Sequence, residues 1–486
     1  MKIELKTAPK TFTEKEFIAC FYDDENIFYE GLPEQYQKAI INKGREPLLM
    51  PISNGDTFGY IYFLSLSSVK HFPRTEAVKI LAADALQKAE KLEEKKMSFL
   101  VNCENAQDFI PYIAEGVCLG AYRFDRYITK KKDKNKLVEI VNIYCRPKDI
   151  KALSKPVEDI MKLCKLVNEA RDITNEPGDI ATPEKLAQTA KKLSRQFALE
   201  CDIFDEKRLK KEGYNGLLTV GAASQKPPRM IVLKYKPSKT KSKTHLCIVG
   251  KGITFDIGGI CIKPPKSMWE MKGDMAGAAA ALYIVAAAAQ KKIPITVTAV
   301  VPAAENAIGS RATLPGAIFK AKNGKTVHVD NTDAEGRLIL TDALALAETL
   351  NPTHLIDIAT LTGSCAMALG GSISGLFGDN PDFNKAFMEA AEEAGELFWE
   401  LPLHREYIEK LKCDYADLNN IGNVREGGAI HGALFLSEFK PEGVPWIHLD
   451  IAGTSLNTSS WKYFRPGATG VTIRTIVRLA ERLAST

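Results

Sequence analysis

Residues 245–289 read HLCIVGKGITFDIGGICIKPPKSMWEMKGDMAGAAAALYIVAAAA. The stretch begins with an apolar run, residues 245–256, which predicts a strand that ends at Asp256. It closes with a run from Ala276 to Ala289 that is mostly alanine. This second run is too short to span a bilayer and fits a helix buried against a sheet. A strand, a polar loop and a buried helix in this order predict part of an α/β domain.

The same alternation of strands and helices continues on both sides of this stretch. Apolar strand-like runs cover residues 230–235, 245–256, 295–303, 326–330, 354–360, 374–378 and 446–453. Helical patterns begin near Pro183, Asp274, Gly336, Asp382, Gly428 and Gly470. Apolar strands separated by helices predict an α/β fold with a central mixed sheet that helices flank on both faces. In such sheets the chemistry collects just beyond the strand ends, which is where the polar clusters of this chain fall.

The first 150 residues differ from the rest of the chain in their sequence patterns. They combine strand-like runs at 59–66 and 136–145 with a charged helical stretch at 82–97, and they contain no obvious site. Residues 157–175 then show apolar positions at helical spacing and stop at the breaker 175–178, NEPG. We therefore predict a smaller N-terminal α/β domain (1–150), a linker helix (151–175) and a larger domain (176–486).

Composition indicates a soluble globular protein. Hydrophobic residues make up 45% and charged residues 26% of the 486 residues. The net charge of +5 is too small to imply nucleic acid or membrane. Ten scattered cysteines without a C-x-x-C pair predict reduced thiols rather than disulfides or structural zinc. The first residues lack the apolar segment of a secretory signal, so we expect a cytoplasmic protein without a membrane partner.

Four polar residues follow or interrupt the opening stretch. Asp256 ends the strand before Gly258–Gly259, Lys251 lies among apolar neighbours, and Lys263 and Asp274 follow. Each also has a simpler interpretation. Asp274 could cap the next helix, Asp256 could be a turn residue, and a lysine near a strand end is usually a solvated surface charge.

A second polar cluster, NTDAEGRL, covers residues 331–338. An extended backbone would point the carboxylates of Asp333 and Glu335 the same way, although Glu335 could instead begin a helix. Together with Asp256 and Asp274 they carry four negative charges, which two divalent ions would neutralise. Oxygen ligands suit magnesium, manganese or zinc, and two such ions could lower the pKa of a shared water. Lys263 and Arg337 could then stabilise an oxyanion.

Other catalytic motifs are absent from the sequence. There is no H-E-x-x-H, and the seven histidines are dispersed. No G-x-S-x-G occurs. Phe319 occupies the position of the first P-loop glycine before Gly324-Lys325-Thr326, and Phe255 replaces the third glycine of a G-x-G-x-x-G. A histidine-ligated protease, a serine hydrolase with that motif and a nucleotide-binding protein therefore have no support.

NTDAEGRL resembles the signature of the leucyl aminopeptidase (cytosol aminopeptidase) family of di-metal exopeptidases. VGKGITFD, MKGDMAG, DIATLTG, HGALFLSEF and HLDIAGT also resemble family blocks, in the family's order, over most of 165–485. The resemblance implies Asp256, Asp333 and Glu335 as ligands of one metal ion, and Lys251, Asp256, Asp274 and Glu335 as ligands of the other. It implies Lys263 and Arg337 as the catalytic pair, with Arg337 holding a bicarbonate that acts as general base. The residues that match the family's substrate pocket are Met271, Asn331, Thr360, Leu361, Gly363 and Ala452.

The resemblance implies an aminopeptidase that removes N-terminal residues, especially bulky apolar ones such as leucine, from peptides with two ions of manganese or zinc, or of magnesium. By analogy it also implies a homohexamer. Lys251 would bind metal as a neutral amine, which requires a lowered pKa. Cleavage of cysteinylglycine needs the same residues. A DNA-binding regulator is the alternative from another class, with basic runs at 130–136 and 236–243, although solvated loops explain both runs better.

Overall fold

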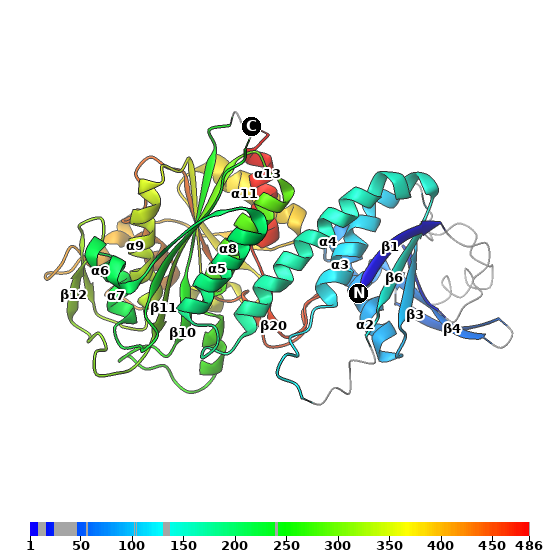
Figure 1. The fold of residues 1–486 in the computed structure, drawn as a ribbon. Helices are drawn as coiled ribbons and strands as arrows, with labels where there is room; N and C mark the ends of the chain where they lie inside the picture. Colours follow the sequence, from blue (N-terminus) through cyan, green and yellow to red (C-terminus); the bar gives the residue numbers. More distant parts are fainter. Residues whose placement is uncertain are drawn as a thin grey trace. The chain divides into compact units, whose positions relative to one another are not determined.

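The computed structural model describes residues 1–7, 16–23, 46–54, 57–101, 103, 105–129, 137–238 and 242–485. It divides into two compact units. Unit 1 comprises Met1–Lys165 and Ser459–Pro466, and unit 2 comprises Leu166–Thr458 and Gly467–Thr486. One long helix, α4 (Pro147–Asn175), contains the division and ends at Asn175, the first residue of the NEPG breaker (Figure 1). Among the described residues, no helix combines the length and the apolar character needed to cross a membrane.

Unit 1 contains a six-stranded sheet in the order β1-β6-β5-β2-β4-β3. All neighbours are parallel except β3 and β4. Its strands are β1 (Lys2–Thr7), β2 (Phe17–Tyr22), β3 (Leu48–Asn54), β4 (Thr57–Ser65), β5 (Lys96–Leu100) and β6 (Ile140–Cys145). Helices α2 (Arg74–Lys91) and α3 (Ile110–Gly120) pack against each other. Side chains from alternate positions of β2 enter two apolar clusters, so the sheet of unit 1 is buried on both faces.

The helical stretch expected at 82–97 differs from the structure at both ends. Helix α2 begins earlier, at Arg74, and ends at Lys91. Glu93 then adopts a positive φ of 62°, which turns the chain out of the helix. Lys96 and Met97, placed in the helix by the charge pattern, begin β5 instead. The pattern failed here because a charged helix end and the first residues of a strand have similar composition.

Unit 2 is built on a mixed nine-stranded sheet, which confirms the predicted fold class. The path runs β16-β15-β18-β14-β9-β11-β8-β7, and β10 pairs with β11. Strands β9, β11, β14 and β18 pair in parallel, whereas β7, β8 and β15 join antiparallel. Their bounds are β7 (Glu200–Phe204), β8 (Arg229–Tyr235), β9 (His245–Gly250), β10 (Gly252–Asp256), β11 (Thr296–Asn306), β14 (His354–Ala359), β15 (Ser374–Gly378), β16 (Phe398–Glu400) and β18 (Trp446–Asp450).

Helices cover both faces of this sheet, as the alternating pattern predicts. On one face α5 (Pro183–Phe197), α8 (Ala276–Lys291) and α13 (Ile473–Leu483) lie together, with α11 (Pro381–Ala394) beside α13 (Figure 1). On the other face α9 (Glu335–Thr349) packs between α7 (Asn215–Gly221) and α12 (Gly428–Ser437). The remaining elements are α6 (Glu206–Glu212), α10 (Gly363–Leu369), a small sheet of β12 (Ala317–Lys320), β13 (Thr326–Val329) and β17 (Leu418–Asn419), and a hairpin of β19 (Leu456–Asn457) and β20 (Gly467–Ala468).

The alanine-rich helix α8 is buried almost all round because it lies between the sheet and outer helices. Small side chains let its backbone come close to the strands. A Cβ on Gly277 would lie 2.1 Å from the carbonyl oxygen of Ile358 on β14, so only glycine fits at that position. The close approach brings the beginning of α8 directly to the ends of β9, β10 and β14, where the polar residues predicted from the sequence collect.

Candidate metal centre

Lys251 interrupts what the sequence presents as one strand. Residues 245–256 form two strands, β9 and β10, with the break at Lys251. Its backbone N–H donates to Ile358 O (3.0 Å) and its carbonyl accepts from Ala278 N (2.9 Å). The side chain is buried, with 3% exposed, which excludes the solvated surface charge considered above. Gly336 makes room for it, because a Cβ there would lie 2.4 Å from Lys251 Cε.

The ammonium of Lys251 lies among acceptors from three segments. Nζ is 2.9 Å from both Asp274 Oδ1 and Glu335 Oε1, and it donates to Thr360 O (2.8 Å). Burial opposes the charge, yet the carboxylates of Asp274, Glu335 and Asp256 outweigh burial and raise the pKa of Lys251. The neutral amine expected from the sequence therefore depends on cations that neutralise these carboxylates.

Asp256 ends β10 with its two oxygens in different surroundings. Oδ1 accepts from Gly258 N (2.9 Å) and from Asn306 Nδ2 (2.7 Å), so the turn interpretation of this residue is also correct. Oδ2 lies 2.8 Å from Lys263 Nζ, which is also 2.5 Å from Asp333 Oδ1. Burial alone would lower the pKa of Lys263, but Asp256 and other carboxylates raise it. Lys263 is therefore a cation in this arrangement.

The reason given for bringing Asp333 and Glu335 together was wrong, although the two residues do meet. The backbone around Asp333 is a turn rather than extended, with Asp333 N donating to Asn331 Oδ1 (2.8 Å). Glu335 is the first residue of α9, as the alternative interpretation held. A turn followed by a helix start places both carboxylates on the same side as Asp256.

Asp274 does not cap helix α8. The capping position is Met275, which has no side-chain hydrogen bond to the helix. The Asp274 carboxylate instead accepts from Thr360 Oγ1 (2.5 Å) and from Lys251 Nζ. Asp274 thus points into the cluster rather than along the backbone of its own helix.

These residues form what we call the site cluster: Lys251, Lys263, Asp256, Asp274, Asp333 and Glu335. Oxygens of Asp256, Asp333 and Glu335 lie within 4.8 Å of one another. Burial raises the pKa of Asp256 and Asp333, and raises that of Asp274 well above its ordinary value. Converging oxygens whose charge is costly without cations fit hard divalent metal ions. Asp274 Oδ2 and Glu335 Oε2 have no hydrogen-bond partner, which agrees with that fit.

The site cluster lines a cavity of about 330 Å³. Its other walls come from the loops after β14 and β18 and from the segment before α8. Five of the residues predicted to bind substrate lie in these walls, namely Met271, Thr360, Leu361, Gly363 and Ala452. Asn331 and Arg337 are not among the lining residues. Asn331 instead accepts from Asn420 Nδ2 through its carbonyl (2.6 Å).

Arg337 is a buried cation without an ion pair in the described part of the chain. Its Nη1 donates to Asn420 O (2.7 Å), and its Nε has no partner. Burial lowers the pKa of its guanidinium to about 10, against the favourable charges of Glu335 and Asp450. His431, whose two ring nitrogens are both unpartnered, is a further buried polar group near this charge. A buried guanidinium with unused donors suits a small anion.

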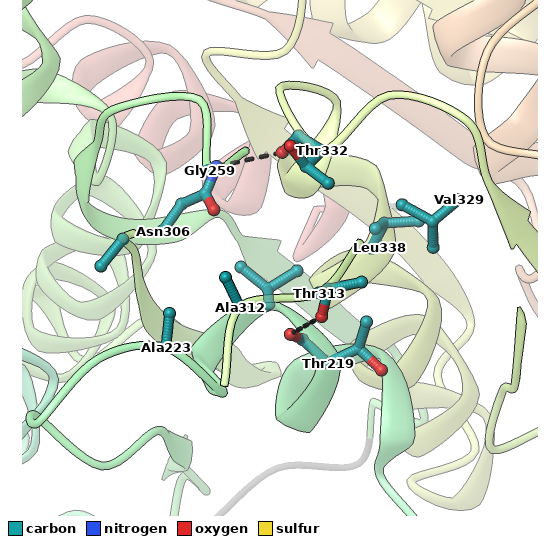
Figure 2. A pocket seen from close by; sticks show the side chains of 11 residues that line it. Thr219, Ala223, Gly259, Asn306, Ala312, Thr313, Val329, Thr332 and Leu338 are labelled. Atoms are coloured by element: carbon teal, nitrogen blue, oxygen red, sulfur yellow. Dashed lines mark hydrogen bonds between the residues drawn. The ribbon is translucent and has the colours of Figure 1, made fainter. Parts of the chain in front are cut away.

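A second cavity is lined by Asn306, which donates to Asp256 of the site cluster, and by Thr332, which precedes Asp333 (Figure 2). Its volume of about 10 Å³ is close to that of one water and far below that of a peptide. Figure 2 shows Asn306 Nδ2 donating to Thr332 O (3.0 Å) and Thr313 Oγ1 donating to Thr219 O (2.6 Å). Asn306 thereby fixes both Asp256 and the segment before Asp333.

Three residues at the site went unnoticed in the sequence, namely Asn306, Thr362 and Asp450. Asn306 directly follows Glu305 at the end of β11 and belongs to no catalytic motif. Thr362 and Asp450 lie inside the blocks DIATLTG and HLDIAGT, but neither has a role in the implied ligand sets. Position at a strand end was the one available signal, and it applies to Asn306 and Asp450.

The basic runs behind the DNA-binding alternative are only partly described. Residues 130–136 lie outside the described residues, and of the run 236–243 the structure describes 236–238 and 242–243. DNA binding therefore stays a prediction from sequence.

Comparisons with known proteins give consistent matches in both sequence and fold. A family model, the catalytic domain of the cytosol aminopeptidase family, matches residues 168–477. A probable cytosol aminopeptidase of Solibacter usitatus is 44% identical over 79% of each chain. One from Sulfurihydrogenibium sp. is 39% identical over 96% of this chain and 94% of its own. Among solved structures, the bottromycin maturation enzyme BotP in complex with Mn is 27% identical, with a TM-score of 0.84 over 96% of this chain and 99% of its own.

Proposed function

This chain belongs to the cytosol aminopeptidase family, and on that premise we propose that it releases N-terminal residues, preferably bulky apolar ones such as leucine, from peptides by a two-metal mechanism. The members of this family are metal-dependent aminopeptidases, so hydrolysis of the first peptide bond is the class of reaction. The observation that carries the proposal is the convergence of four carboxylates and two lysines on one cavity. The preference for leucine and the number of two metal ions go beyond the family membership and are part of our proposal.

The site cluster has room and charge for two divalent ions. Following the family resemblance, Asp256, Asp333 and Glu335 would hold one ion, and Lys251, Asp256, Asp274 and Glu335 the other. Manganese and zinc are the metals proposed, with magnesium as an alternative. Bound there, the ions would supply Lewis acidity to the scissile carbonyl and lower the pKa of the attacking water.

The chain's own cations supply the rest of the electrostatics. Lys263 lies at the cavity wall with a pKa raised by carboxylates, so it stays charged and would stabilise the oxyanion that develops on the carbonyl. Arg337, with its unused Nε, would hold bicarbonate, which would take the proton of the attacking water. Leu361 lines the cavity and lies close to Gly432, which in turn lies near Arg337 Nη2, so the anion would be held next to that wall.

The preference for apolar residues is proposed from the apolar residues that line part of the cavity. Met271, Ala366, Ala452 and Leu456 line the cavity together with Gly363. An apolar wall favours side chains such as leucine, because each buried CH₂ contributes about 0.8 kcal/mol. Cysteinylglycine would use the same residues and differs only in its first side chain.

Kinetics on aminoacyl amides test the proposal directly. The metal-loaded protein should hydrolyse leucine amide faster than glycine amide, and it should leave the N-acetylated counterparts intact, because acetylation removes the amine's lone pair. Comparable turnover of blocked and free substrates would identify an endopeptidase or an esterase instead. No turnover of any free amide, with bound metal verified, would end the proposal.

Two further properties are proposed on the family alone. We propose a homohexamer, which sedimentation equilibrium would distinguish from smaller assemblies. We also propose a cytoplasmic location, because the relatives are named as cytosol aminopeptidases. The basic runs at 130–136 and 236–243 leave DNA binding as an alternative function. Salt-dependent gel shifts would test it.

A further inference from the structure

The carboxylate of Asp450 joins two separate stretches of the cavity wall. Asp450 is the last residue of β18, pairs with Ala359 on β14 and is 1% exposed. Its Oδ1 accepts from the backbone N–H of Leu361 (3.1 Å) and of Ala452 (3.1 Å). Leu361 follows β14 and Ala452 follows β18, and both line the cavity. One oxygen therefore sets the spacing between the two wall segments.

The other oxygen of Asp450 extends the link to a helix. Oδ2 accepts from the hydroxyl of Thr362 (2.6 Å), and Thr362 Oγ1 in turn accepts from Cys365 N in the first turn of α10 (3.0 Å). Thr362 is thus the N-cap of α10 and is anchored at the same time to β18. The loop that leaves β14 and the beginning of α10 are fixed to one carboxylate.

The opposite end of this loop is tied to the site cluster. The carbonyl of Thr360 accepts from Lys251 Nζ (2.8 Å), and its hydroxyl donates to Asp274 Oδ1 (2.5 Å). The segment from Thr360 to Thr362 is therefore held between the site cluster on one side and Asp450 on the other. A shift of Asp450 would move the wall relative to the proposed metal ligands.

Beyond its hydrogen bonds, the charge of Asp450 acts on neighbouring buried groups, for example by helping to raise the pKa of His448. No cationic side chain of the described chain forms an ion pair with this carboxylate, and Arg337 acts on it only through the longer-range field. A buried carboxylate without an ion pair costs free energy unless hydrogen bonds compensate it. Here all compensating donors belong to the cavity wall or to the helix that follows it.

We propose that Asp450 is a positioning residue that sets the size selectivity of the pocket for the peptide's first side chain. This inference rests on the proposed function, since it assigns that pocket to an aminopeptidase. Asp450 touches no substrate. It holds the backbone of Leu361, Thr362 and Ala452 at the spacing that an apolar side chain of leucine's size requires, so its loss widens and loosens the pocket.

The test measures selectivity rather than rate. The ratio of kcat/KM for leucine amide to that for glycine amide does not depend on the fraction of folded, active protein. In Asp450→Ala this ratio should fall about tenfold or more, because the fit of a single methylene in an apolar pocket is worth about 10–200-fold in selectivity. Asp450→Asn should keep most of the ratio, since its side-chain oxygen still accepts both backbone N–H groups. Metal content should be unchanged in both variants.

Glu396 offers a matched control. It is also a buried carboxylate that accepts from two backbone N–H groups, those of Thr472 and Thr475, and from the hydroxyl of Thr475 (2.5 Å). Unlike Asp450 it has an ion pair, with Arg474 Nε 3.3 Å from its Oε1, so its loss should cost at least as much stability. It contacts the beginning of α13 and does not line the cavity. Glu396→Ala should lower the melting temperature and leave the leucine-to-glycine ratio as in the wild type.

The outcomes separate this inference from the proposed function. A ratio within twofold of the wild type in Asp450→Ala, or an equal loss in Glu396→Ala, overturns the positioning role. Should Asp450→Ala fail to fold, Thr362→Val decides, since it removes the hydroxyl bond to Oδ2; an unchanged ratio there also overturns the role. Failure of the wild type to hydrolyse any amide ends the proposed function, and calorimetric binding of leucine against glycine then decides the selectivity role.

Discussion

Two groups of buried lysines and carboxylates, one in each unit, use the same residue types for different ends. In unit 1 Lys462 Nζ lies 2.8 Å from Glu76 Oε1, and Lys79 Nζ lies 3.2 Å from Glu76 Oε2 and 3.4 Å from Glu115 Oε2. These four residues, which we call the unit 1 cluster, carry two positive and two negative charges. They join Ser459–Pro466 to the rest of unit 1.

The site cluster of unit 2 also contains two lysines, but it contains four carboxylates instead of two, so its formal charge is −2. It also opens on a cavity, where the side chains of Lys263 and Asp333 are 20% and 31% exposed, whereas the side chains of the unit 1 cluster are at most 4% exposed. A cluster with equal numbers of positive and negative charges is neutralised by its own ion pairs, and its role is structural. Surplus negative charge beside a cavity requires cations from outside. The difference between a structural and a functional cluster therefore lies in charge balance and access, not in residue type.

Removal of the metal should have the largest effect, because only the site cluster is expected to depend on bound cations. Prolonged dialysis against a chelator should abolish amide hydrolysis, by about a thousandfold or more, and manganese or zinc should restore it. The melting temperature should fall with the metal as well, because ions that bind the native state stabilise it. Parallel metal analysis and activity assays check this. Full activity in a sample shown to be free of metal would mean that the surplus charge serves another purpose.

Replacing one lysine of each cluster by methionine should separate a structural role from a role in metal binding. Lys79→Met leaves two buried glutamates with one cation, which should cost about 3–5 kcal/mol in the free energy of unfolding and leave metal binding as it was. Lys251→Met removes an implied ligand of one ion, so the chain should retain about one ion after dialysis where the wild type retains two.

Denaturant unfolding and elemental analysis on both variants measure these effects. Each variant is the control of the other, since both lose one buried ammonium of similar size. Two tightly held ions in Lys251→Met would make this lysine a counter-ion only, as Lys79 is in unit 1.

Arg337 and Arg171 allow the same contrast between buried arginines. Arg337 donates to Asn420 O (2.7 Å) beside the site, and Arg171 donates to Ala468 O (2.7 Å) on strand β20 and does not line the cavity. Arg337→Ala should lower kcat by a factor of about 100, the size found when a charge-stabilising donor is lost. Arg171→Ala should mainly lower stability. Added bicarbonate should stimulate the wild type and Arg171→Ala but not Arg337→Ala; equal stimulation of all three would refute the anion role.

The fold of unit 2 and most of the site cluster could be predicted because their signals are local. A strand that ends at Asp256, or a helix that begins beside Glu335, is visible within a few residues of sequence. Contacts between distant segments are not visible in this way. Thr362 meets Asp450 across 88 positions, and Asn306 meets Asp256 across 50, with no spacing or periodicity that links them. The three-dimensional sheet creates these pairs by bringing the ends of different strands together.

The smallest effect should come from the neutral donors that hold one carboxylate of each unit. Asn306 Nδ2 donates to Asp256 Oδ1 at 2.7 Å, while in unit 1 Asn142 Nδ2 donates to Glu16 Oε1 at 3.3 Å. Both amides are buried.

In Asn306→Ala the carboxylate of Asp256 keeps only the Gly258 N–H on that oxygen, so it can rotate away from the site cluster. Loss of a hydrogen bond from a neutral donor to a carboxylate costs about 1.5 kcal/mol, so metal affinity should fall about tenfold, which a chelator competition titration measures. Asn142→Ala should lower stability by a similar free energy and leave the titration midpoint where it is. If both variants shift the midpoint equally, the effect travels through stability, and Asn306 has no special hold on the site.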